Sequence, residues 1–244
     1  VVFQRSVTMG HGAVVDRLLQ DVRPLCFGPP VAHVYNPLTY ARAGYDAYAD
    51  RYGKGPKEVL LVGMNPGPWG MVQTGVPFGD AAMVREWMGI DVDVRPPAAM
   101  HPKRPVYGFS CPRGEVSGKR LWGWAKRRFG PPERFFSRFF VGNYCPLAFI
   151  EETGKNRTPD ALKQGEKTPL FAACDRALKD LVAHLAPQHV VGIGNFAASR
   201  VAAALSGFGV STGRILHPSP ASPKANRGWA EAVERKLAGM GIRL

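Results

Sequence analysis

Three asparagines and one histidine stand out in this sequence, because each follows a short apolar run and carries a side chain able to do chemistry. They are Asn65, Asn143, Asn195 and His217. Amide and imidazole groups can recognise amide-like edges by hydrogen bonding and can stabilise negative charge as it develops. Metal sites use Asp, Glu, Cys or several His side chains, and no cluster of carboxylates accompanies these four residues. They therefore indicate a polar site without a metal.

These residues can meet only if the apolar runs before them form neighbouring parallel strands. Four runs are predicted to be buried strands, at residues 58–63, 139–142, 189–194 and 213–216. Apolar spacing near 3.6 predicts helices at residues 81–89, 116–129, 169–185, 195–205 and 228–238. This alternation predicts an α/β fold, a three-layer α/β/α sandwich with a short central parallel sheet. Ligands of such folds bind beyond the carboxyl ends of the strands, where the four polar residues lie.

Length and composition limit the class of protein. The 244 residues suffice for one domain, and no linker divides them, so we expect a single domain whose residues 1–20 form an N-terminal extension and a first helix. The 32 Lys and Arg against 19 Asp and Glu give a net charge of +13, which favours nucleic acid as a partner, although an incidental charge is the alternative.

Membrane and secretory signals are missing from the printed sequence. No apolar run approaches the roughly 18 residues of a membrane span, and the first residues lack the apolar core of a secretory signal. We therefore expect an intracellular monomer that contacts no membrane, in the cytoplasm or nucleoid of a bacterium or in the nucleus of a eukaryote.

The four cysteines are widely spaced, at Cys26, Cys111, Cys145 and Cys174. No Cys-x-x-Cys pair occurs, so the spacing gives no zinc or iron–sulfur signature. Scattered cysteines of this kind are typical of reduced, buried side chains in a cytosolic protein. We expect no cofactor and no metal.

Five segments resemble one protein family, in the family's order. GMNPGPWGMVQTGVPFGD at 63–80 resembles the first motif of the single-strand-selective monofunctional uracil-DNA glycosylases, a group of the uracil-DNA glycosylase superfamily. HPSPASPKANRGW at 217–229 resembles the group's second motif and the loop after it. Residues 33–41, 101–122 and 143–159 resemble further segments, so the similarity runs from about residue 20 to the end of the chain.

The resemblance implies an activity and a partner. It implies an enzyme that flips uracil out of single- or double-stranded DNA and hydrolyses the N-glycosidic bond, leaving an abasic site. It also implies activity on 5-substituted uracils such as 5-hydroxymethyluracil, and rejection of thymine. A lyase step needs an amine nucleophile, and none of the motif residues that converge here is a lysine, so the enzyme is expected to be monofunctional.

Two residues are implied to be catalytic. His217 would donate a hydrogen bond to uracil O2 and stabilise the negative charge on the leaving base, for which a neutral imidazole suffices. Asn65 would orient the attacking water. Some related glycosylases have an aspartate at this place, but asparagine can neither remove a proton nor supply negative charge. Activation of the leaving base is therefore expected to contribute more than activation of the water.

The resemblance also assigns the residues that bind the base. Asn143 would accept from uracil N3–H and donate to O4, whereas cytosine presents the opposite pattern, and a further contact that the sequence does not reveal must fix this amide. Phe78 would stack on the extruded base. The walls of the pocket would come from Met64, Gly67 and Met71, the glycine allowing a close approach of the backbone.

The 218–226 loop would fill the gap that the flipped nucleotide leaves. The group's pattern has an arginine directly after His-Pro-Ser-Pro, but this chain has Ala221, which fills less space and contacts no phosphate. Strong activity on well-paired duplex is therefore not expected unless Lys224 or Arg227 compensates. The residues expected to contact DNA are Ser219, Pro220, Ala221, Lys224, Arg227, Lys119 and Arg120.

Two alternatives stay open at this point. The main substrate could be another deaminated base, such as hypoxanthine or xanthine, because pocket motifs alone do not exclude it. The chain could also be a lesion-binding protein without turnover, as Ala221 and the lack of a catalytic carboxylate suggest. A set of oligonucleotides that each carry one lesion separates these alternatives from uracil excision.

Overall fold

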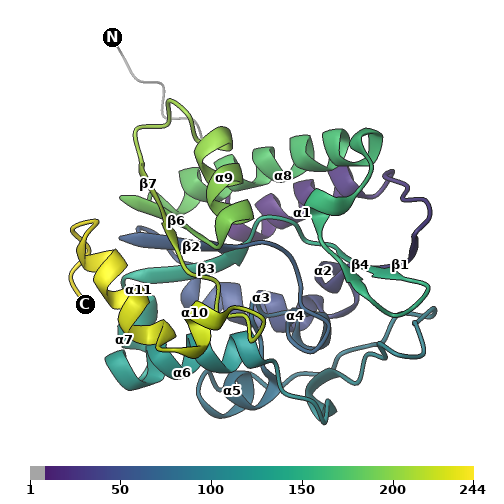
Figure 1. The fold of residues 1–244 in the computed structure, drawn as a ribbon, viewed down its shortest axis with the longest axis horizontal. Helices are drawn as coiled ribbons and strands as arrows, with labels where there is room; N and C mark the ends of the chain where they lie inside the picture. The colour runs from purple at the N-terminus through teal and green to yellow at the C-terminus, as the bar shows by residue number, and fades with distance from the viewer. Residues whose placement is uncertain (1–8) are drawn as a thin grey trace.

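A parallel four-stranded sheet forms the centre of the part of the chain that the structure describes, residues 9–244 (Figure 1). In this computed structural model the strands lie in the order β3, β2, β6, β7. Their bounds are Phe139–Asn143, Val59–Gly63, His189–Ile193 and Ser211–Ile215. The four predicted strands are confirmed, although β7 begins at Ser211 and not at 213.

Helices cover both faces of the sheet, so the predicted three-layer arrangement is confirmed (Figure 1). One layer contains α1 (His11–Val22), α8 (Gln164–Leu185) and α9 (Asn195–Ala204). The other layer contains α3 (Arg42–Tyr52), α6 (Val116–Phe129), α7 (Pro132–Phe136) and α11 (Trp229–Ala238). Because both faces are covered, every residue of β2 is buried, which explains its unbroken apolar sequence. The largest core cluster draws on side chains from Val15 to Ile242.

The helix predictions are confirmed, with one early start. The bounds of α6, α9 and α11 are close to the predicted ones, and α5 (Ala81–Glu86) ends sooner. The helix expected from residue 169 begins at Gln164, so that Pro169 lies inside it. The carboxylate of Glu166 accepts hydrogen bonds from the backbone N–H groups of Lys163 (3.0 Å) and Gly28 (2.8 Å), which stabilises this early start.

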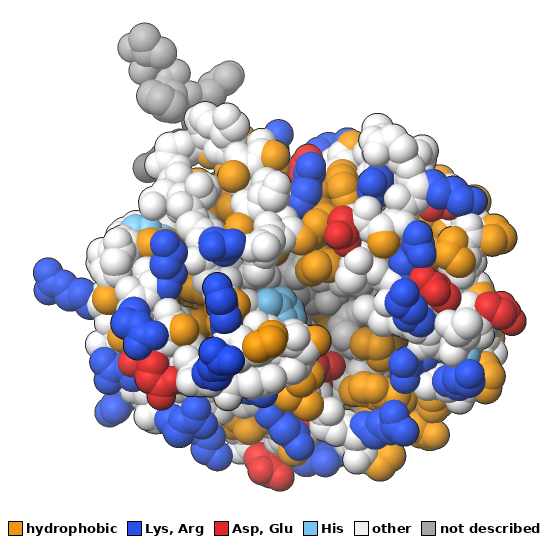
Figure 2. Space-filling view, viewed as in Figure 1, with side chains coloured by type: hydrophobic (Ala, Val, Ile, Leu, Met, Phe, Trp, Pro, Cys, Tyr) orange, Lys and Arg blue, Asp and Glu red, His pale blue; other side chains and the backbone are white. Residues whose placement is uncertain are grey.

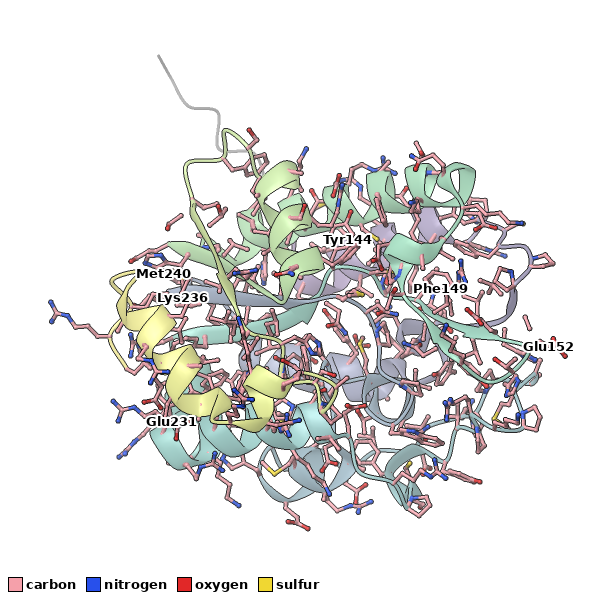
Figure 3. All side chains as sticks on the ribbon, viewed as in Figure 1. Tyr144, Phe149, Glu152, Glu231, Lys236 and Met240 are labelled. Atoms are coloured by element: carbon pink, nitrogen blue, oxygen red, sulfur yellow. The ribbon has the colours of Figure 1, made fainter. Side chains whose placement is uncertain are left out.

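A second, three-stranded antiparallel sheet was not predicted. It has the order β1, β4, β5, with bounds Val31–Tyr35, Ala148–Glu151 and Asn156–Arg157. In this sheet β1 is only partly buried and β5 has only two residues, so their pattern in the sequence is weak. Figure 3 shows Glu152 at the outer tip of the hairpin between β4 and β5, whereas Phe149 on β4 is fully buried. The inner end of this sheet lies close to the end of β3.

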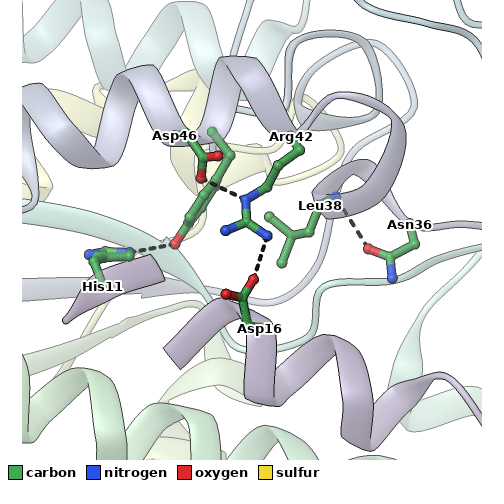
Figure 4. Close-up of polar contacts among 7 residues, drawn as sticks. His11, Asp16, Asn36, Leu38, Arg42 and Asp46 are labelled. Carbon is green, nitrogen blue, oxygen red and sulfur yellow. Dashed lines mark hydrogen bonds and ion pairs between the residues drawn. The ribbon is translucent and has the colours of Figure 1, made fainter. Parts of the chain in front are cut away.

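The first helix is part of the fold. His11 on α1 is 2.7 Å from the hydroxyl of Tyr45 on α3, and Arg42 pairs with Asp16 (2.8 Å) and Asp46 (2.6 Å), as Figure 4 shows. Val15 and Leu18, on the same face of α1 as His11, are buried in the core. The extension expected before this helix falls largely on residues 1–8, outside the described residues.

Two short helices pack against each other. They are α2 (Pro37–Tyr40), whose first turn is capped by the Asn36 side chain (3.2 Å to Leu38 N; Figure 4), and α4 (Met71–Thr74). The remaining short helix, α10 (Pro223–Asn226), follows β7 and is capped by Ser222. Among the described residues, no helix is both long and apolar enough to cross a membrane.

Candidate active site

A cavity of about 360 Å³ opens at the carboxyl ends of β2 and β3. All seven residues expected to act on or bind the base line it, namely Asn65, His217, Met64, Gly67, Met71, Phe78 and Asn143. Residues that were not predicted from the sequence also line it, namely Pro66, Gly70, Glu115, Ser117, Asn156 and Thr158. One residue of the 218–226 loop, Ser219, completes the lining. The space-filling view shows a hollow in the middle of this face (Figure 2).

Backbone pairing continues past the strand ends and holds the 63–80 and 143–159 segments together. Gly63 on β2 lies opposite Asn143 on β3, and beyond them Tyr144 N–H donates to Gly63 O and Cys145 N–H to Met64 O, both at 2.9 Å. The Tyr144 hydroxyl then donates to Asp175 on α8 (2.6 Å) and accepts from Arg200 on α9 (3.0 Å). Figure 3 shows Tyr144 directly beneath these helices. The end of β3 is therefore held from both sides.

Asn65 is held by one end of its amide. Its Nδ2 donates to the backbone oxygen of Leu147 at 3.1 Å. This bond fixes which end of the amide is the nitrogen and leaves Oδ1 to accept a hydrogen bond in the cavity. An acceptor in a fixed position can orient a water molecule, although it cannot take the proton of that water.

Asn143 presents an unpaired acceptor. Its Nδ2 lies 3.2 Å from the sulfur of Met71, and its Oδ1 is buried with no hydrogen-bond partner among the described residues. A buried acceptor without a partner is costly, so a ligand N–H placed there would be stabilised. The contact with Met71 supplies the orientation of the amide that the sequence did not reveal, since a thioether sulfur accepts hydrogen bonds but donates none.

Phe78 is held in a strained backbone conformation. Its φ angle is +54°, which a bulky residue rarely adopts, and its carbonyl accepts from Trp122 Nε1 at 3.0 Å and from the Asp80 N–H at 2.8 Å. A Cβ at Gly118 would clash with this carbonyl, and a Cβ at Gly63 would clash with the Phe78 ring. The packing of two glycines and a tryptophan therefore directs the Phe78 ring into the cavity.

His217 lies beside that ring, with 6.1 Å between the two ring centroids. Burial lowers the pKa of His217 below its ordinary value of 6.5, so the imidazole is neutral at pH 7. A neutral imidazole has one N–H to donate. No hydrogen bond to this ring occurs within residues 9–244, so the ring is free to bind a ligand.

The prediction that four polar residues converge is correct for three of them. Asn195 is exposed at the start of α9, and its side-chain oxygen accepts a hydrogen bond from Arg214. It borders a neighbouring groove and not the cavity. The strand before it, β6, lies between β2 and β7, but α9 begins at once and turns the side chain away.

One carboxyl group, which was not predicted from the sequence, lies in the cavity. Glu115 Oε1 accepts from Ser117 N–H at 3.2 Å, and a Cβ at Gly67 would lie 2.8 Å from its Oε2. Burial raises the pKa of Glu115, and repulsion from Asp80 raises it further. Glu115 was missed because it precedes α6, far from any strand end. Its position within the 101–122 motif segment was the available signal.

The 218–226 loop is supported from below by Arg120, which was expected to contact phosphate. Its guanidinium donates to Pro218 O (3.3 Å), Ser219 O (3.2 Å) and Asn226 Oδ1 (2.7 Å). These bonds commit the side chain to the loop, so the structure places it as a support and not as a free cation. Its neighbour Lys119 is exposed.

Within this loop, Ala221 is exposed and its N–H donates to Ser219 Oγ at 3.2 Å. The Asn226 side chain donates to Pro220 O at 2.9 Å. The loop is thus internally bonded while the side chain at 221 faces outward.

A basic groove of about 760 Å³ adjoins the cavity and shares His217 with it. Its cations are Arg214, Lys224, Arg227, Arg235 and Lys236. None of them forms an ion pair with any described residue, and no acidic side chain lines the groove. Figure 2 shows Lys and Arg side chains gathered on this side of the hollow, over α10 and α11.

Comparisons with known proteins agree with this geometry. A family model described as the uracil DNA glycosylase superfamily matches residues 51–237. The chain is 46% identical over 240 residues to the single-strand selective monofunctional uracil-DNA glycosylase of Rattus norvegicus, covering 98% of this chain and 86% of the rat protein. It is 45% identical to the corresponding protein of Bos taurus, covering 98% and 88%. A crystal structure of wild-type SMUG2 from Pedobacter heparinus has a similar fold, with a TM-score of 0.66 at 19% identity over 93% of this chain and 97% of that one.

Proposed function

The chain belongs to the uracil-DNA glycosylase superfamily, and from this premise we propose that it hydrolyses the N-glycosidic bond of uracil in DNA and leaves an abasic site. The observation that carries the proposal is the amide of Asn143, whose nitrogen is engaged by Met71 and whose buried oxygen has no partner in the described residues. Uracil N3–H is a donor that fits this acceptor, whereas cytosine N3 is an acceptor that would repel it.

Binding begins with extrusion of the nucleotide, which costs a few kcal/mol and least in single strands or mismatches. The extruded ring enters the cavity and stacks on Phe78, whose orientation is fixed through its carbonyl. Asn143 then distinguishes uracil from cytosine by hydrogen bonding.

Bond cleavage depends on the charge that develops on the base. The electron pair of the C1′–N1 bond moves into the uracil ring, and the neutral His217 donates its N–H to uracil O2. One such donor lowers the barrier by about 2.7–4 kcal/mol. Water held by Asn65 Oδ1 adds to C1′ and loses its proton to solvent, since an amide does not accept it. No lysine lines the described cavity, which supports hydrolysis without a lyase step.

We extend the proposal to 5-substituted uracils. Gly67 and Gly70 have no side chains, which lets Glu115 pack against both of them at one wall of the cavity. Glu115 Oε2 has no hydrogen-bond partner in the described chain and can accept from the hydroxyl of a 5-hydroxymethyl group. A thymine methyl group would leave the same oxygen desolvated and unpaired, which is unfavourable.

We also propose a location and a substrate form. An enzyme of this activity works on DNA inside the cell, in a nucleoid or a nucleus. It acts as a monomer, because a single copy of the chain contains the whole cavity. Single- and double-stranded DNA are both substrates, and duplex is the weaker one because Ala221 offers little to fill the base stack.

A set of single-lesion oligonucleotides, single- and double-stranded, tests the proposal by direct detection of the free base. We expect release of uracil and 5-hydroxymethyluracil, and no release of thymine or cytosine. Release of hypoxanthine far above uracil would instead support the deaminated-purine alternative. Tight binding without release of any base would support a lesion-binding protein.

A further inference from the structure

We infer that a second groove, next to the cavity, binds a single-stranded DNA segment that flanks the flipped uracil. This inference rests on the proposed function. The groove measures about 440 Å³, and its functional side chains are Trp69, Lys103, Arg104, Tyr107 and Arg113. We call it the Trp69 groove. It is separate from the basic groove beside α11, with which it shares no lining residue.

The Trp69 groove combines positive charge with aromatic rings. The guanidinium carbons of Arg113 and Arg104 lie 4.7 and 5.4 Å from the centre of the Trp69 ring. Tyr107 is 52% exposed, an unusual degree for so large an apolar ring. The described lining contains no acidic residue. Proteins that bind single-stranded DNA combine such features, since cations follow the backbone and bases stack on rings.

The two arginines have unused hydrogen-bonding capacity. Arg104 Nε is buried with no partner among the described residues, and neither arginine takes part in an ion pair there. Stacking on Trp69 orients both guanidinium groups without occupying their N–H donors. A phosphate group in the groove supplies acceptors for the exposed donors of Arg113 and for the terminal donors of Arg104. Tyr107 remains as the platform on which a base can stack.

The groove is rigidly connected to the cavity. Trp69 lies in the turn closed by a 3.2 Å bond from Gly70 N–H to Gly67 O, and both glycines line the cavity. Gln73 is fully buried, and its Nε2 donates to Pro68 O (2.8 Å) and to Pro105 O (3.0 Å). Its Oε1 accepts from the Tyr107 N–H at 2.8 Å. One buried side chain therefore fixes the groove relative to the site where the base is cleaved.

The position of the Trp69 groove next to the cavity indicates which form of DNA it binds. A strand whose uracil occupies the cavity must leave it on one side or another, and the turn that carries Trp69 forms one border. Bases of a duplex are already stacked on one another, so a ring such as Tyr107 can stack only on a base in a single strand. The structure thus assigns a single-stranded segment, not a duplex, to the Trp69 groove.

The test uses single-stranded oligonucleotides that carry one uracil and a flank lengthened on one side at a time. We expect kcat/KM of the full chain to rise as one of the two flanks grows. Tyr107→Ala and Arg113→Ala should each remove about tenfold of that gain, while the rate on the shortest substrate stays unchanged. Tyr107→Phe should keep the gain, because the ring is retained. Phe208→Ala, which removes an exposed ring elsewhere, is the matched control.

A binding experiment without catalysis complements the kinetics. The chain has five tryptophans, and four of them are at most 8% exposed, which leaves Trp69 as the accessible fluorophore. A uracil-free thymidine oligonucleotide should change this fluorescence, and Trp69→Phe should abolish the change. A duplex of equal length should cause a much smaller change.

Three results would overturn the inference. They are an equal effect of the variants on the shortest and longest substrates, an equal fluorescence response to duplex, and a gain with flank length that Tyr107→Ala leaves intact. Failure of the proposed function looks different, because the unaltered chain would then release no uracil from any oligonucleotide.

Discussion

The side-chain nitrogen of Asn143 lies 3.2 Å from the sulfur of Met71, and the oxygen of the same amide is buried without a partner in the described chain. This contact fixes which end of the Asn143 amide is the nitrogen, so that the side chain can recognise uracil. An asparagine free to flip would accept cytosine equally well, because its two ends differ only in which one donates. The thioether breaks that symmetry, since it can only accept.

Asn143→Asp should lower kcat/KM on uracil oligonucleotides by at least about tenfold, because a carboxylate repels uracil O4 and leaves a charge unpaired. Met71→Leu keeps the size of the side chain but removes the sulfur, so it should narrow the preference for uracil over cytosine by a smaller factor. Base release from matched uracil and cytosine oligonucleotides measures both. Unchanged selectivity in Asn143→Asp would contradict the assigned role.

His217→Leu should reduce the rate of base release by about 10²–10³-fold, the usual cost of losing one donor to a developing charge. Binding to uracil-containing DNA should persist, because the stacking and recognition residues remain. Single-turnover rates and a binding titration with the same oligonucleotide separate the two effects. A variant that releases uracil at the original rate would refute the role of His217.

Arg120→Met and Lys119→Met form a matched pair of neighbours on α6. Arg120 donates three hydrogen bonds to the 218–226 loop, so its loss should lower activity on single- and double-stranded substrates about tenfold, at about 0.5–1.5 kcal/mol for each bond weakened. The salt dependence of binding should not change, because no phosphate contact is lost.

Lys119→Met should change the salt dependence of binding and leave activity nearly unaltered. If the exposed ammonium contacts a phosphate, the log–log slope of binding against salt should become shallower by about 0.7–0.9, with little effect on catalysis. A shallower slope for Arg120→Met would show that Arg120 contacts DNA after all.

Ala221→Arg should raise activity on paired duplex more than on single strands. The side chain at 221 is exposed on a loop that Arg120 and Asn226 hold in place, so a longer residue can enter the base stack without disturbing the cavity. Paired measurements of kcat/KM on the same sequence, single-stranded and annealed, provide the comparison. An equal gain on both forms would exclude a wedge function for this position.

Acid should destabilise the fold through His11. Burial lowers the pKa of His11 from 6.5 to about 4, and the positive field of His184 adds to the shift. Between these values the unfolded chain binds the proton and the folded chain does not, so stability falls as the pH drops below 6.5. From pH 7 to pH 5 this group accounts for about 2 kcal/mol of the free energy of unfolding, at about 1.36 kcal/mol per pH unit.

Urea unfolding at pH 7 and pH 5 tests this prediction with His11→Gln, which keeps a polar group near Tyr45. Between pH 7 and pH 5, the free energy of unfolding of the variant should fall by about 2 kcal/mol less than that of the unaltered chain. Equal losses would show that other groups cause the acid sensitivity.

Much of the fold could be predicted from the sequence because its central strands are covered on both faces. Such strands are apolar throughout, so β2 and β6 are evident without any knowledge of their partners. The strands of the antiparallel sheet cannot be recognised in this way. In this sheet β1 exposes part of one face and β5 has only two residues, so their patterns are hard to tell from those of a loop.

Among the site residues, the sequence determined those that follow strand ends, because the carboxyl ends of parallel strands meet at one edge. Asn65, Asn143 and His217 were found in this way, and the family motifs added Phe78. What the sequence could not determine was which groups face one another. The position of Glu115 against Gly67, the support that Arg120 gives to the loop, and the sulfur next to Asn143 all join residues far apart in the chain. Only tertiary packing decides such contacts, because they depend on side-chain direction across elements that no local pattern relates.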